Sequence, residues 1–154
     1  MKSIRLLPIL VFSGLMLITS LPTLAVGSDM IYVIVNNEAK LPELNQKQVI
    51  SLFLGRARNF PNGRAAKPFD HETGSSIREL FFETLTGKQI SDIDAYWARL
   101  SYSGRAFPPK VLNSAQDIMD EVKRNKNAIS YVKGVSKEAL SQQGIVVVYS
   151  IKGS

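Results

Sequence analysis

The stretch that decides the fold is "FDHETGSSIRELFF", residues 69–82. A small polar run, Thr73-Gly74-Ser75-Ser76, leads directly into a segment whose apolar residues recur at helical spacing. Ser76 and Glu79 match the Ser-x-x-Glu pattern of a capping box, in which each side chain bonds a backbone N–H group. The stretch therefore predicts a helix that starts near Ser75.

The same helix start has the chemistry of an anion site. The first N–H groups of a helix have no acceptor within it, and the helix dipole places partial positive charge there. Gly74 would let a ligand approach the backbone closely, Ser75 and Ser76 would add hydroxyl donors, and Arg78 would add a planar cation. These residues are compatible with an oxyanion site and with a simple capping box, since a capping hydroxyl can turn to a ligand.

The N-terminal residues predict export. Lys2 and Arg5 precede an apolar run that polar and small residues interrupt, and Thr23 and Ala25 follow it as small side chains. This layout is typical of a secretory signal cleaved after Ala25. The run is short for a membrane-spanning helix, which needs about 20 predominantly apolar residues. We therefore expect residues 1–25 to be a signal peptide and residues 26–154 to form one domain.

Composition favours one cellular compartment and one class of ligand. The chain has no cysteine, whereas small secreted animal domains usually depend on disulfides, so a soluble protein of the bacterial periplasm is favoured. The formal net charge of +6 favours anionic ligands or surfaces. Nucleic acid also fits this charge, but the export signal argues against it.

Residues 26–154 alternate between strand and helix patterns, which predicts an α/β domain with a central sheet. The predicted strands are Ile31–Val35, a short segment after the turn at residues 61–63 that Pro68 would keep near an edge, Asn127–Val132 and Ile145–Tyr149. The predicted helix caps are Asn45 with Gln48, Ser91 with Asp94, and Ser114 with Asp117. The predicted core residues are Ile77, Phe81, Trp97, Leu100, Ile118 and Val122.

The residues of the usual catalytic and metal sites are scarce. His71 is the single histidine, so cysteine–histidine nucleophiles and zinc clusters are not expected. Asp70, His71 and Glu72 are consecutive and point in different directions on a strand or loop, so they form no triad. We expect no enzyme activity, no metal and no cofactor. The arginines of a basic loop are either solvated charges or the rim of an anion pocket: Arg56, Arg58 and Arg64.

Four segments in order resemble the periplasmic phosphate-binding proteins, the solute receptors of phosphate ABC transporters, and in particular their short members. Residues 74–81, "GSSIRELF", are similar to the Gly-Ser-Gly-Thr-Arg-x-x-Phe helix start of that family. The other three similar segments are "LNQKQVISLFLGRARNFPNG" (residues 44–63), "AYWARLSYSGRAFPPK" (residues 95–110) and "NAISYV" (residues 127–132). Within the helix start, Ser76 replaces a glycine, Ile77 replaces a phosphate-contacting threonine, and His71 stands where an arginine holds phosphate.

The resemblance implies a single lobe of the type 2 periplasmic binding protein fold, with a central mixed sheet flanked by helices. It implies binding of phosphate or a similar oxyanion, and the residues that correspond to the family's ligand site are Gly74, Ser75, Ser76, Ile77, Arg78 and His71. It also implies an ABC transporter permease, or a second copy of the lobe, as a partner, with membrane contact only through a permease. The alternative is a non-catalytic scaffold protein of the envelope that keeps the lobe without tight ligand binding.

Overall fold

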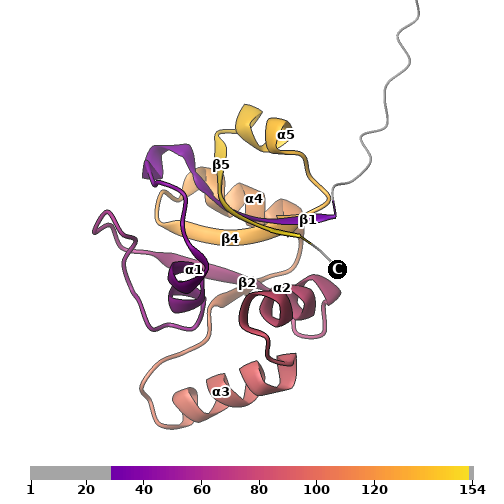
Figure 1. Cartoon of the computed structure of the whole chain (residues 1–154). Coiled ribbons are helices and arrows are strands. Elements are labelled where there is room, and N and C mark those ends of the chain that lie inside the picture. Colours follow the sequence, from indigo (N-terminus) through magenta and orange to yellow (C-terminus); the bar gives the residue numbers. More distant parts are fainter. Residues whose placement is uncertain (1–28, 153–154) are drawn as a thin grey trace, which may run out of the picture.

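The computed structural model describes residues 29–152 of the chain. Five strands alternate with helices, as Figure 1 shows. The strands are β1 (Met30–Asn36), β2 (Lys67–His71), β3 (Lys110–Leu112), β4 (Ala128–Lys133) and β5 (Ile145–Lys152). The helices are η1 (Asn37–Ala39), α1 (Gln46–Phe53), α2 (Ser76–Thr86), α3 (Ile90–Tyr102), α4 (Ala115–Arg124) and α5 (Lys137–Gln142). The predicted signal segment, residues 1–25, lies outside the described residues.

The strands form one mixed sheet in the order β3-β2-β4-β1-β5. β2 pairs in parallel with β3 and with β4, whereas β1 pairs antiparallel with β4 and β5. The first strand therefore lies inside the sheet, next to the edge strand β5, and its partners are the last two strands of the chain: Ile31 lies opposite both Lys133 and Ile151. The predicted α/β class with a central mixed sheet is confirmed.

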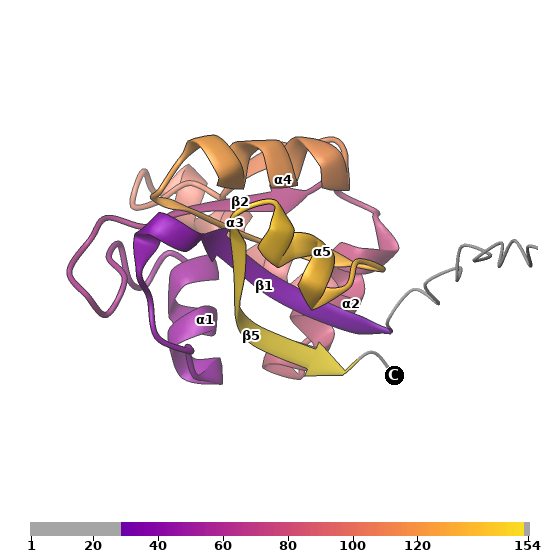
Figure 2. The same ribbon diagram turned by 90° about the horizontal axis from the view of Figure 1, so that it is seen from above.

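Each face of the sheet carries its own apolar core. Successive side chains of a strand point to opposite faces, so Ile31 and Val33 of β1 enter one core and Tyr32 and Ile34 enter the other. α1, α2 and α3 cover the first face, and α4 and α5 cover the second, an arrangement that Figure 2 shows for α4 against α1 and α2. Both cores lie within residues 31–151.

The structure confirms most of the predicted core. Four of the six residues are buried: Phe81, Trp97, Ile118 and Val122. Ile77 and Leu100 are half-buried and pack against the core from outside. No helix within residues 29–152 is long and apolar enough to span a membrane.

The edge of the sheet differs from the prediction. β2 lies near an edge as expected from Pro68, but it is not itself the edge strand, because β3 pairs outside it and the sequence pattern did not reveal β3. Proline is tolerated here because β3 pairs with β2 only from Phe69 onward, so no ladder bond from β3 needs an N–H group at residue 68.

Two of the predicted caps form and two do not. Asn45 and Gln48 make a reciprocal capping box, and Ser114 accepts a hydrogen bond from the Asp117 N–H group. The predicted cap at Ser91 is wrong, because α3 begins at Ile90 and its N-cap is Gln89, two residues before Ser91. The capping box at Ser76 and Glu79 is also wrong, because the residue that precedes α2 is Ser75.

Candidate anion-binding site

The start of α2 lies at the carboxyl edge of the parallel strands. β2 ends at His71, which lies opposite Leu112 at the end of β3, and α2 begins at Ser76. In open α/β sheets, ligands bind beyond the carboxyl ends of the strands. The topology therefore places the predicted anion site where this fold class carries its ligands.

The first turn of α2 leaves donors without protein acceptors. The Ser75 hydroxyl donates to the carbonyl oxygen of Glu72 at 2.8 Å and does not cap the helix. Within residues 29–152, the backbone N–H groups of Ser76 and Ile77 have no protein acceptor, and the Ser76 side chain is exposed. Gly74 has φ of 84°, a left-handed conformation that suits glycine, and its Cα faces open space.

Arg78 is buried beneath this turn and is paired with two carboxylates. Its Nε donates to Asp70 Oδ2 at 3.0 Å, and its Nη2 donates to Asp94 Oδ1 at 2.7 Å. Burial lowers the pKa of Arg78, but the bonds to Asp94 and Asp70 outweigh it and raise the pKa above its ordinary value. The third nitrogen, Nη1, is buried without a partner among the described residues. The charge of Arg78 is thus compensated within the protein.

Asp70 joins β2, β4 and α2 in one polar network. Its Oδ1 accepts hydrogen bonds from the Tyr131 hydroxyl at 2.5 Å and from the backbone N–H of His71 at 2.8 Å. Burial and the neighbouring charge of Asp70 raise the pKa of Tyr131 well above its ordinary value, so this hydroxyl stays protonated as a donor. The ring of Tyr131 stacks on Phe81, with 3.7 Å between ring centroids. The network therefore fixes the first turn of α2 against the sheet.

His71 is a neutral, buried side chain in this arrangement. Its Nε2 lies 2.8 Å from the carbonyl oxygen of Tyr131, which can only accept, so Nε2 carries the proton. Burial lowers the pKa of His71, although the Tyr131 carbonyl and the charge of Asp70 act in the opposite direction. The resemblance includes His71 in the ligand site, where only a protonated ring would add positive charge. The lowered pKa moves that protonation to more acidic conditions.

The structure brings five of the six predicted site residues, residues 74–78, into one turn, with His71 buried below it. Sequence reasoning missed the roles of Asp70, Asp94 and Tyr131. Asp94 was expected to be the partner of a helix cap at Ser91, but α3 begins at Ile90 and Asp94 instead bonds Arg78. One signal was available in the sequence: Arg78 shares a helical face with Phe81, Phe82 and Leu85. A cation on an apolar face requires a buried acid as its partner.

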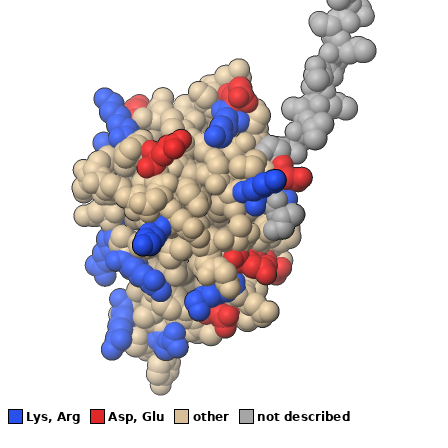
Figure 3. All heavy atoms as spheres, in the orientation of Figure 1, with Lys and Arg blue, Asp and Glu red and all other residues tan. Residues whose placement is uncertain are grey.

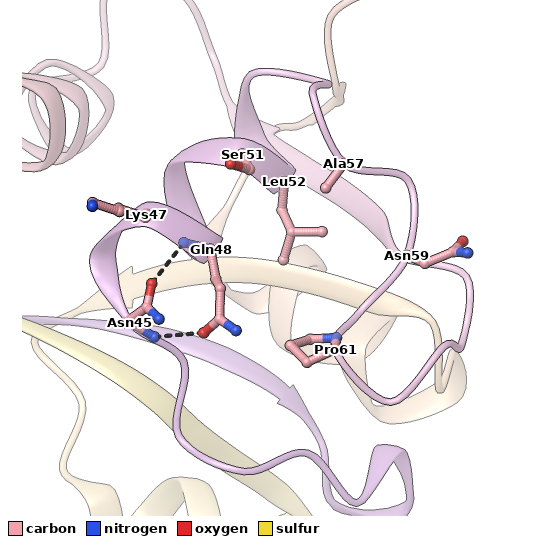
Figure 4. Close-up of a pocket in the computed structure, with 8 residues that line it drawn as sticks. All are labelled: Asn45, Lys47, Gln48, Ser51, Leu52, Ala57, Asn59 and Pro61. Carbon is pink, nitrogen blue, oxygen red and sulfur yellow. Dashed lines mark hydrogen bonds between the residues drawn. The ribbon is translucent and has the colours of Figure 1, made fainter.

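One surface hollow lies away from this turn. Figure 4 shows a hollow of about 380 Å³ between α1 and the loop at residues 57–61. Gln48, Leu52 and Pro61 face it, and Lys47 also lines it. Among residues 29–152, no cluster of histidine, aspartate and glutamate side chains is suited to holding a metal ion.

Comparison with solved structures identifies the fold. The similar structures include an ABC-type phosphate transport receptor from Vibrio cholerae (TM-score 0.56, 15% identity) and PstS from Borrelia burgdorferi (TM-score 0.58, 11% identity). A third is a Clostridium perfringens protein assigned as a phosphate ABC transporter substrate-binding protein and solved with bound phosphate (TM-score 0.57, 18% identity). The chain shares its fold with part of each of these proteins.

The similarity covers most of this chain but a minor part of the receptors. The three alignments cover 77%, 80% and 77% of this chain and 44%, 48% and 43% of the respective receptors. The chain thus spans less than half of the length of each solved protein. Protein-family profiles and curated proteins give no match. The resemblance expected from the four sequence segments is confirmed at the level of the fold.

Proposed function

We propose that this chain is a periplasmic solute-binding module that takes up phosphate or a similar oxyanion at the start of α2 and serves ABC-type uptake. The observation that carries the proposal is the fold shared with phosphate receptors, one of them solved with bound phosphate. The unpaired N–H groups of Ser76 and Ile77 support it, since a helix N-terminus with free donors attracts anions.

The residues of the site take different roles in this proposal. The N–H groups of Ser76 and Ile77 and the Ser76 hydroxyl contact the anion, and Ser75 joins them when its hydroxyl leaves Glu72. Gly74 keeps the approach open. Arg78 is a positioning residue, because Asp70 and Asp94 already hold its guanidinium group. His71 supports the turn as a neutral side chain.

One lobe leaves most of the anion in water, so we expect weak binding, with a Kd of about 1 mM, which corresponds to about −4 kcal/mol. A permease or a second copy of the lobe would cover the exposed side of the ligand. The alternative function, an envelope scaffold without tight ligand binding, is favoured by one observation. Arg78, the cation nearest the turn in sequence, is compensated inside the protein and adds little net charge to the site.

The test is an NMR titration of residues 26–154 with phosphate and with sulfate. Saturable shifts of the Ser76 and Ile77 amide signals are expected. Ser76→Pro should abolish them, because proline at the first helical position removes the N–H group while it fits helix geometry. Ser75 has φ of −75° and ψ of 134°, which suits a residue before proline. Ser76→Ala, which keeps the N–H group, should weaken binding only in part.

The matched control is Ala115→Pro, which places proline at the first position of α4 and should leave the titration unchanged. Sulfate carries the same charge from pH 7 to pH 6, and the lowered pKa of His71 predicts little change in sulfate affinity over that range. Absence of saturation at tens of millimolar anion, or shifts confined to other regions, would favour the scaffold function.

A further inference from the structure

Two segments of the chain contain cations and no acids. Residues 51–69 and 95–116 together hold seven of the 19 lysines and arginines and none of the 13 aspartates and glutamates. The rest of the chain is therefore close to electrically neutral. Net positive charge is not spread over this protein but belongs to these two segments.

The fold brings the two segments together beside the amino end of β2. One hollow of about 460 Å³ is lined by Arg58 and Pro68 from the first segment and by Arg105 and Phe107 from the second. A neighbouring hollow of about 220 Å³ is lined by Lys67 and, again, by Phe107. Figure 3 shows lysine and arginine side chains along the lower left of the molecule, with no acidic side chain among them.

The charges of this surface are available to a partner. Six of its cations are exposed, and we call them the basic face: Arg56, Arg58, Lys67, Arg99, Arg105 and Lys110. Within residues 29–152, none of the six forms an ion pair with an acid. The hollow beyond Lys110 is lined by Asp117 and Asp120, which mark the limit of the basic face.

Two aromatic side chains project from the basic face. Tyr102 is 97% exposed and Phe107 is 73% exposed, the two highest values among the large hydrophobic residues described. Arg99 precedes Tyr102 by three positions on α3, so the two side chains share a helical face. Exposed aromatic rings among unpaired cations match an anionic membrane surface, where rings settle at the headgroups and cations bind lipid phosphates.

We propose that the basic face, with Tyr102 and Phe107, binds the surface of membranes rich in anionic phospholipid. This inference goes beyond the proposed anion site and uses a different part of the molecule. An acidic peptide would satisfy the cations from within the two hollows, but Tyr102 lines neither hollow and would stay in water. A lipid surface would contact both rings and the cations at the same time. Direct lipid contact would hold the protein at the membrane where a permease lies.

The test measures co-sedimentation of residues 26–154 with vesicles. Phosphatidylcholine vesicles that contain phosphatidylglycerol should bind the protein, pure phosphatidylcholine vesicles should not, and added salt should weaken the binding. Arg56→Gln, Arg58→Gln and Arg105→Gln combined should lower the partition coefficient roughly 100-fold, at about fivefold for each cation. Tyr102→Ser should lower it roughly tenfold.

The matched control is the triple variant Lys40→Gln, Lys88→Gln and Lys152→Gln, which removes three exposed cations from elsewhere and should bind vesicles far better than the arginine triple variant. Ser76→Pro should leave vesicle binding unchanged, which separates this face from the α2 start. Equal losses in the two triple variants, or no binding to anionic vesicles at low salt, would overturn the proposal. Binding to polyglutamate without binding to vesicles would assign the face to an acidic protein instead.

Discussion

At the carboxyl end of β2, Arg78 is buried and bonded to two carboxylates, whereas at the amino end of the same strand Arg105 is exposed in a segment without acids. Both arginines follow short loops rich in small residues, and neither looks unusual in the sequence. Burial of Arg78 requires compensation, since an unpaired charge in an apolar interior is very costly. Exposure of Arg105 requires none, so its charge remains available for a partner.

This contrast shows that an arginine near a ligand turn is not thereby a ligand. Arg78 stabilises the turn from below, so its substitution should first lower the unfolding free energy of the protein. Arg105 contributes little to the fold, so its substitution should instead weaken binding to a partner. Stability measurements and binding measurements therefore separate the two regions.

The largest effect is expected from Arg78→Met. Removal of one partner from a buried ion pair leaves the other charge uncompensated, which costs about 3–5 kcal/mol of unfolding free energy. Urea unfolding followed by circular dichroism measures it. The matched variant Arg105→Met should change the unfolding free energy by no more than about 0.5 kcal/mol. If Arg78→Met does not fold, the double variant Asp70→Asn with Arg78→Met should recover folded protein, because the uncompensated charge is gone. Equal effects of the two single variants on the unfolding free energy would contradict the contrast between a buried Arg78 and an exposed Arg105.

An intermediate effect is expected from Tyr131→Phe. The substitution keeps the ring that stacks on Phe81 and removes only the hydroxyl that donates to Asp70. Hydrogen bonds to charged groups contribute about 1.5–3 kcal/mol. Thermal and urea unfolding should both show this loss. The control is Tyr102→Phe, whose hydroxyl is exposed and whose stability should match that of the parent protein.

The smallest effect is expected from the titration of His71. Its pKa in the folded protein is lowered, so the folded state favours the neutral form more than the unfolded chain does. Stability from this group is therefore fully present above the unfolded pKa of about 6.5 and is lost as the pH falls through the folded pKa. The Tm of the parent protein should fall between pH 7 and pH 5. The variant His71→Gln should show a smaller fall, and an identical slope would contradict a buried neutral His71.

The sequence predicted the parts of this fold that depend on local chemistry. Asn45 with Gln48 and Ser114 with Asp117 form helix caps as expected, because a cap needs only residues three positions apart. β1, β4 and β5 were recognisable as apolar, β-branched runs. The three-residue strand β3 was not, since two prolines precede it and pairing with β2 alone defines it.

The candidate site was predictable in position but not in its internal bonding. Gly74 and Ser75 belong to a helix-start pattern that is visible in the sequence alone. The partners of Arg78 come from β2 and α3, which fold onto α2 only in the tertiary structure. The N-cap of α3 is Gln89, two residues before the expected cap at Ser91, and Asp94 is a partner of Arg78 instead of a partner of that cap.

The position of β1 between β4 and β5 has a consequence for how the chain reaches its folded form. Both partners of β1 come from the far end of the sequence, with Ile31 opposite Lys133 and Ile151. The two ladders of β1 therefore cannot both close until nearly the whole chain is available, and such long-range pairing slows folding. In the export that we propose, a chain of this topology would stay open during synthesis, which is the form that a narrow membrane channel can thread. The topology itself would then delay folding until the last strand has crossed.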